Sequence, residues 1–183
     1  MKKGFFLMLP LLAILAGARA QQRFTCDNAV VSFFSSAPLE DIDARTDKGI
    51  STLDIQTREL YFKIPVNTFQ FKRSLMQEHF NSDYLETEKY PFAEFKGQLQ
   101  GSDSLTRAGT YTVSVKGQLT IHGVTRDCTA DGTLTVMSDR IRAVSAFQVR
   151  LADYNIKIPR LVIRNIAEVV DVKINADYLP GPS

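Results

Sequence analysis

The sequence predicts an all-β protein, an eight-stranded antiparallel barrel with a short helix capping one end. Three observations predict this fold. Runs that alternate apolar and polar residues recur along the chain, short turns separate most of them, and only one stretch has helical periodicity. Eight strands with alternating faces close most naturally into an up-and-down barrel, because closure removes exposed strand edges.

The first twenty residues have the features of a secretory signal peptide. Two lysines form a basic start, a short apolar core follows, and Ala18-Arg19-Ala20 is a cleavage site. We therefore expect residues 1–20 to be removed and residues 21–183 to form one exported domain, periplasmic or secreted in a bacterium. No later stretch approaches the roughly 18 consecutive apolar residues typical of a transmembrane helix.

Removal of this segment changes the charge balance. The formal charge is +2, but the segment contains three bases (Lys2, Lys3 and Arg19) and no acids. The remaining 19 basic residues face 20 acidic ones, which gives a net charge of −1. Nucleic-acid binding therefore has no electrostatic support.

Eight segments have strand character, and one longer loop is expected near residues 152–166. The second segment has an irregularity near Lys48-Gly49. The predicted strands cover residues 24–35, 39–55, 59–66, 92–100, 111–121, 124–136, 141–151 and 167–177.

The stretch LTIHGVTRDC (119–128) predicts a hairpin with a two-residue loop at His122-Gly123. In this register Leu119 faces Arg126, Gly117 faces Cys128 and Val115 faces Ala130, so apolar residues gather on one side. The glycine supplies the positive φ that such a turn needs. We therefore interpret His122 as a turn residue rather than as a catalyst or metal ligand.

A second turn at Ser138-Asp139 extends this hairpin into a three-stranded meander. Folding about it places Leu134 opposite Ala143 and Gly132 opposite Ser145. The same register places two pairs nearer the other end of the meander. They are Ala130 with Phe147 and Cys128 with Val149.

One stretch, FKRSLMQEHFN (71–81), predicts a helix. Phe71, Leu75, Met76 and Phe80 fall on one side, and Asn81 is a suitable left-handed end. A helix placed between strands in this way can cap one end of the barrel.

The predicted inner wall mixes large side chains with small ones, including Gly117, Cys128 and Ala130. The small residues indicate room for an apolar ligand, whereas large residues of the opposite wall, such as Phe62 and Phe95, could fill the same space. Arg126 also falls on the inner face, close to the turn. Its side chain either extends out through the rim or pairs with a polar ligand headgroup at the mouth.

Three stretches of the sequence resemble the YceI-like family. They are LMQEHFNSDYLETEKYPFAEFKG (75–97), GQLTIHGVTR (117–126) and FQVRLADYNI (147–156), and the resemblance runs from about residue 23 to residue 177. It implies a lipocalin-like barrel, exported to the cell envelope, with a polyisoprenoid enclosed in its interior. The implied ligand-binding residues are Phe62, Ile64, Leu75, Phe95, Val115, Gly117, Leu119, Arg126, Cys128, Ala130, Phe147 and Val149, and the headgroup candidates are Arg73, His79 and Arg126.

We therefore expect a non-enzymatic binding or carrier protein for a polyisoprenoid or similar long apolar lipid, with no metal and no other cofactor. The sequence leaves open whether the protein forms a homodimer. One alternative is an enzyme acting on a lipid or quinone, with His79, His122, Arg126 and Tyr154 as acid, base or oxyanion groups. The other is a ligand-free interaction module serving envelope stress tolerance.

The two cysteines are expected to stay unbridged even in an oxidising compartment. Cys26 lies near the start of the first strand, whereas Cys128 lies four residues after the His122-Gly123 turn, which falls at the opposite end of the barrel. Residues that far apart cannot bring their Cα atoms within the roughly 7 Å that a disulfide requires.

Overall fold

The computed structural model describes residues 23–36, 41–101, 105–157 and 168–181. The signal peptide predicted for residues 1–20 lies outside these residues. One helix, α1 (Ser74–His79), continues into a π-helical turn, η2 (Phe80–Tyr84), and two short 3-10 turns are η1 (Val66–Thr68) and η3 (Leu151–Tyr154). The strands are β1 (Arg23–Ser35), β2 (Ile42–Asp54), β3 (Glu59–Pro65), β4 (Gln70–Phe71), β5 (Phe92–Leu99), β6 (Gly109–Ile121), β7 (Val124–Val136), β8 (Ile141–Arg150) and β9 (Val169–Pro180).

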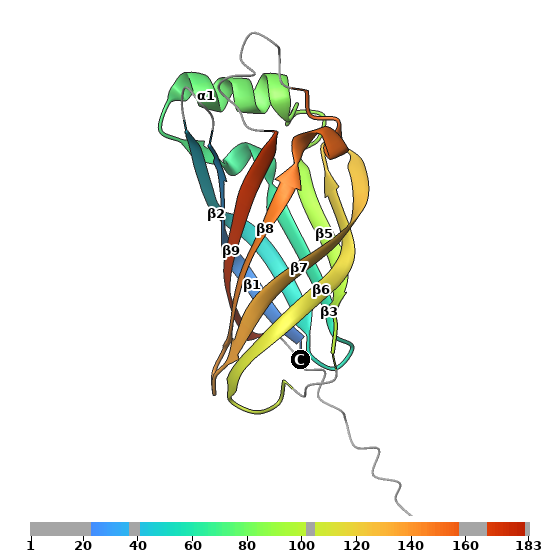
Figure 1. Cartoon of the computed structure of the whole chain (residues 1–183). Helices are drawn as coiled ribbons and strands as arrows, with labels where there is room; N and C mark the ends of the chain where they lie inside the picture. Colours follow the sequence, from blue (N-terminus) through green and yellow to red (C-terminus); the bar gives the residue numbers. More distant parts are fainter. Residues whose placement is uncertain (1–22, 37–40, 102–104, 158–167, 182–183) are drawn as a thin grey trace, which may run out of the picture.

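Eight long antiparallel strands form a closed barrel, as the sequence predicted. Neighbours in the ring follow chain order, and β1 closes it by pairing with β2 on one edge and β9 on the other. One further strand, β4, has two residues and, among the described strands, pairs only with β2. Figure 1 shows α1 lying across one end of the barrel, and we call this the helix end; the opposite end, where β1 begins and β9 finishes, is the closed end.

The predicted hairpin registers are found where the ladders are continuous. The β6–β7 ladder runs from Ile121–Val124 to Gly109–Val136 and includes Gly117 opposite Cys128. His122 and Gly123 both have positive φ, of 51° and 71°, which is the geometry of a tight hairpin turn. The predicted irregularity in β2 is also present, because the register against β1 shifts on both sides of Gly49.

The β7–β8 ladder departs from the prediction. It pairs residues 132–136 of β7 with residues 141–145 of β8 and goes no further. The expected pairs Ala130–Phe147 and Cys128–Val149 are therefore wrong. The strands part because each follows its other neighbour, β7 staying with β6 as far as Val124 and β8 staying with β9 as far as Arg150.

The helix is shorter than predicted and ends differently. It begins at Ser74, and the chain does not stop at Asn81 but passes through the π-helical turn, in which the Leu85 N–H donates to the carbonyl of Phe80. The left-handed residue is Glu86, with φ 43°. This longer turn brings Leu85 into the same core as Phe80, which the sequence pattern already places on the apolar side of the helix.

The closed end of the barrel is filled with side chains. Leu53, Leu99, Leu105 and Ile141 are all buried there. Tyr178 is 2% exposed, and its hydroxyl lies 2.7 Å from the hydroxyl of Ser51, which itself lies 2.6 Å from the carbonyl oxygen of Tyr61. This chain of bonds satisfies a polar group in an apolar core, and burial raises the pKa of Tyr178, so its hydroxyl stays neutral.

Both cysteines are free, in agreement with the sequence prediction. Cys26 is buried near the closed end, whereas Cys128 lies on the inner wall near the helix end, four residues after Val124, where β7 begins. Burial raises the pKa of each thiol, so both behave as small apolar groups.

The β2–β3 turn at the closed end depends on Asp54. One of its carboxylate oxygens accepts the backbone N–H groups of Gln56 and Thr57, each at 2.9 Å, and the bond from Thr57 is the main cause of a lowered pKa. A carboxyl group with a lowered folded-state pKa stabilises the fold at neutral pH, and this contribution is lost as the pH falls through that pKa.

We predict that Asp54→Ala lowers the free energy of unfolding at pH 7 by about 1–3 kcal/mol, because two backbone N–H donors of the turn lose a charged acceptor. The difference from the unmodified protein should shrink as the pH falls below the ordinary aspartate pKa, roughly 4, and through the lower folded-state pKa of Asp54. Urea unfolding at pH 7 and pH 3 measures both values. Asp127→Ala, which removes an exposed carboxylate of the outer wall, is the control; an Asp54 effect of equal size at both pH values would contradict the prediction.

Candidate ligand cavity

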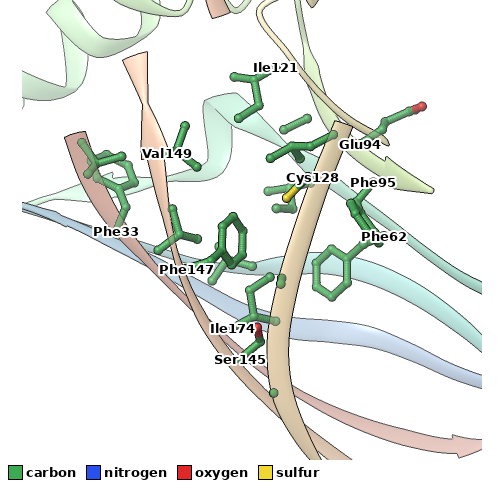
Figure 2. Close-up of a pocket in the computed structure, with 18 of the residues that line it drawn as sticks. Phe33, Phe62, Glu94, Phe95, Ile121, Cys128, Ser145, Phe147, Val149 and Ile174 are labelled. Atoms are coloured by element: carbon green, nitrogen blue, oxygen red, sulfur yellow. The ribbon is translucent and has the colours of Figure 1, made fainter. Parts of the chain in front are cut away.

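The interior of the barrel contains a cavity of about 250 Å³. Its lining comes from every long strand and from the helical segment, and it is almost entirely apolar (Figure 2). The sequence left open whether this space is filled by large side chains of the opposite wall. Phe62 and Phe95 do reach into the interior, but they line the cavity rather than fill it.

Nine of the twelve residues implied as ligand contacts line this cavity. They are Phe62, Ile64, Phe95, Val115, Leu119, Cys128, Ala130, Phe147 and Val149. The other three, Leu75, Gly117 and Arg126, are not among its lining residues. Each of the three departs from the expectation for its own physical reason.

Leu75 points away from the barrel and is 56% exposed. The helix begins only at Ser74, so Met76 and Phe80, four residues apart, form the face turned toward the cavity. Phe71 precedes the helix in β4 and therefore does not define a face of it. Placing Leu75 on the apolar side was wrong because the predicted helix began too early.

Gly117 marks a close approach of two strands rather than open space. A Cβ atom added there would collide with the backbone of Lys96 and Gly97 on β5. Opposite it, Gly97 is covered by the ring of Phe95 from its own strand, 2.6 Å from a Cβ added at Gly97. Glycine at both positions therefore lets β5 and β6 curve tightly past each other.

Four phenylalanines form a cluster beneath the helical segment. Phe33, Phe69, Phe71 and Phe80 all line the cavity, and the ring centroids of Phe71 and Phe80 are 4.8 Å apart. Phe33 stacks on Phe80 with a centroid separation of 5.6 Å. Sequence analysis missed Phe69. This residue follows a short 3-10 turn, so it belongs neither to a helical nor to a strand periodicity that the sequence could reveal.

The three headgroup candidates lie outside the cavity. The Arg126 guanidinium is at the rim, where its Nε donates to the carbonyl of Asp153 at 3.0 Å. His79 lies on the helical segment with its Nδ1 2.6 Å from the Asp83 carboxylate, both side chains about half exposed. Arg73 immediately precedes α1 and is exposed.

His122 joins three parts of the helix end. Its Nδ1 lies 3.2 Å from the carbonyl oxygen of Tyr154, and its Nε2 lies 2.7 Å from a carboxylate oxygen of Glu86. The Tyr90 ring packs edge-on against it at 4.5 Å. His122 is thus a turn residue, as predicted, but it also ties the β6–β7 turn to η3 and to the segment after η2.

Three lining residues carry ionisable groups, Glu94, Cys128 and Asp131. The Glu94 carboxylate accepts a hydrogen bond from the Tyr61 hydroxyl and pairs with Lys63, and burial raises the pKa of the Cys128 thiol. Burial raises the pKa of Tyr154 to about 12, so this hydroxyl is neutral at physiological pH. Tyr154 and both histidines lie outside the cavity lining. Within the described ranges, no three histidine, cysteine or acidic side chains lie together as metal ligands would.

A family model described as the YceI-like domain matches residues 19–178. This match covers most of the sequence. The chain belongs to the YceI-like family. No curated protein matches the sequence.

Solved structures of proteins from three bacteria share this fold at low sequence identity. A polyisoprenoid-binding domain from Saccharophagus degradans, implicated in plant cell wall breakdown, is 17% identical with a TM-score of 0.75, over 88% of this chain and 99% of its own. Burkholderia cenocepacia BcnA is 16% identical with a TM-score of 0.68, over 81% of this chain and 95% of its own. The Campylobacter jejuni YceI protein is 15% identical with a TM-score of 0.54, over 74% of this chain and 81% of its own.

The helical segments of this YceI-like chain are short. Across the part of the chain that the structure describes, none is long and apolar enough to cross a membrane.

We predict that Gly117→Ala destabilises the fold by about 1–3 kcal/mol, because the added methyl group meets backbone atoms that cannot move aside cheaply. Ala130→Val adds methyl groups to the same inner wall where the cavity has room, and should change stability by less than about 1 kcal/mol. Thermal and urea unfolding measure both variants. A Gly117→Ala protein as stable as the unmodified one would show that the close strand approach is not required.

Proposed function

We propose that this YceI-like protein is an exported carrier that holds the apolar chain of a polyisoprenoid or similar lipid inside its barrel, and that it is not an enzyme. The observation that carries the proposal is the apolar lining of the cavity, to which nine of the residues implied as ligand contacts contribute. The related domain from Saccharophagus degradans is described as polyisoprenoid-binding, which supports the same ligand class. The leader-like sequence of residues 1–20 supports export to the periplasm or beyond.

The physical basis of binding is removal of the chain from water. Each buried CH₂ group contributes about 0.8 kcal/mol, so two isoprene units already supply substantial affinity without any polar contact. A cavity lined by hydrocarbon reads the width and length of a chain rather than its functional groups. The polar end of the lipid would stay outside, near the rim that carries Arg126.

The volume limits how much of the ligand is enclosed. A cavity of roughly 150 Å³ lined by leucine, isoleucine and phenylalanine holds one benzene molecule. On that scale, the 250 Å³ interior encloses on the order of ten carbon atoms, about two isoprene units. A longer chain is therefore held by one part of its length.

We predict that Ala130→Phe abolishes or weakens binding of farnesol by about tenfold or more, because the new ring occupies the cavity. Thr129→Phe is the matched control: it adds a ring one residue away, on the exposed outer face. Native mass spectrometry and fluorescent-probe displacement measure farnesol binding, with thermal unfolding to show that both variants are folded.

Two results would contradict the proposal. One is failure of the unmodified protein to bind farnesol, geranylgeraniol or solanesol. The other is equal binding by the two phenylalanine variants, which would place the lipid outside the barrel. Lipid extraction of the protein purified from its own host would then identify the natural chain.

A further inference from the structure

The barrel wall is interrupted between β7 and β8. No residue in 124–131 of β7 pairs with a residue in 146–150 of β8 in the described ladders, although each strand remains paired with its other neighbour. Figure 1 shows the two strands diverging toward the helix end. We call the gap between these two stretches the side window.

Side-chain bonds mark both ends of the side window. At the end nearer the closed end of the barrel, Ser145 donates its hydroxyl to the carbonyl of Asp131 at 2.7 Å, just where the ladder stops. At the helix end, η3 turns back toward β7 and receives the bond from Arg126 to the Asp153 carbonyl. The contact of His122 with the Tyr154 carbonyl lies at the same end.

The two sides of the side window are apolar and belong to the cavity. Cys128 and Ala130 line it from β7, and Phe147 and Val149 line it from β8. Figure 2 shows Cys128 on one strand and Phe147 and Val149 on the other, around the same interior space. Along this stretch Cys128, Ala130 and Phe147 are partly buried and Val149 is buried, so the apolar side chains continue from the interior into the gap.

The two ends of the barrel are less suitable than the side window as routes for a ligand into the cavity. The closed end is filled by Leu99, Leu105 and the Tyr178–Ser51 pair. At the helix end, the phenylalanine cluster packs under α1 and η2. Opening that end means separating several ring contacts, whereas the side window has no ladder hydrogen bonds to break among the described residues.

We propose that the lipid chain enters and leaves the cavity sideways, through the side window between β7 and β8. This inference rests on the proposed lipid-carrier function. It also gives the unenclosed part of a long chain a place, since a chain that passes between two strands can have about two isoprene units inside and the remainder outside. The ligand class is therefore prenyl lipids longer than the cavity itself.

The test is to bridge the side window from outside. Thr129 and Gln148 are exposed residues on the two bordering strands, so Thr129→Cys with Gln148→Cys, joined by a flexible bis-maleimide, spans the gap without entering the cavity. The matched control joins Gln148→Cys to Asp171→Cys, which face each other across the intact β8–β9 ladder. Both pairs are built with Cys26→Ser and Cys128→Ala, so that only the new thiols react.

The readout is stopped-flow association and release of dansyl-farnesylamine. We expect the bridge across the side window to slow both rates by about tenfold while changing the dissociation constant by less than roughly twofold, because a blocked route alters kinetics and not the bound state. The control bridge should leave both rates within about twofold of the protein before cross-linking.

A third cross-link tests the competing route. Lys72→Cys with Asp43→Cys ties the connection between β4 and α1 to β2, at a pair whose charged groups lie 4.0 Å apart. Slowing by this link alone, or unchanged rates with the side window bridged, overturns the inference but leaves the carrier function standing. Failure of the protein to bind the probe before any cross-linking overturns the carrier function itself.

Discussion

The structure depends on the pairing of β1 with two partners. Its backbone bonds to β2 on one edge and to β9 on the other, and this closes a sheet that would otherwise expose two edges. Closure at eight strands fixes the diameter of the interior, which is just wide enough for side chains to fill or for one small ligand to occupy. Whether the barrel is solid or hollow is then decided locally, by the size of the residues that point inward.

The size of the inward-pointing residues differs along the barrel axis. At the closed end, Leu53, Leu105 and Tyr178 leave no room, and the tyrosine hydroxyl needs Ser51 as a partner in order to be buried. Farther along, Ala130, Gly132 and Ala143 leave space that larger residues on facing strands border but do not fill. The same closed sheet thus provides a stable base and a hydrocarbon-lined chamber. Because its lining is almost entirely apolar, with Glu94 and Asp131 as its charged members, shape and length are the main properties that such a chamber can distinguish.

The strands and their faces were predictable because alternation along each strand is a local property. The registers of β6 and β7 follow directly from one turn and from the pattern beside it. The extent of a ladder is not a local property, because it depends on how two neighbouring strands twist. The sequence pattern therefore does not reveal that β7–β8 pairing stops at Gly132 and Ser145. For the same reason the sequence pattern does not reveal that Gly117 accommodates the backbone of Lys96 and Gly97 on another strand. Leu75 was misplaced by the boundary of a short helix, which propensity defines only to within a few residues.

Closure by β1 and β9 also has a consequence for how the protein folds. The last strand to be synthesised must find the first, so the final ladder has the largest sequence separation in the domain and carries the largest loop-closure cost. The hairpins of residues 109–150 can form early, whereas the two edges that seal the barrel stay unpaired until residues 169–180 are available. A chain in that state exposes apolar strands to neighbouring chains. Sealing of the barrel by β9 therefore carries the largest loop-closure cost, and conditions that delay β9 should favour aggregation over assembly.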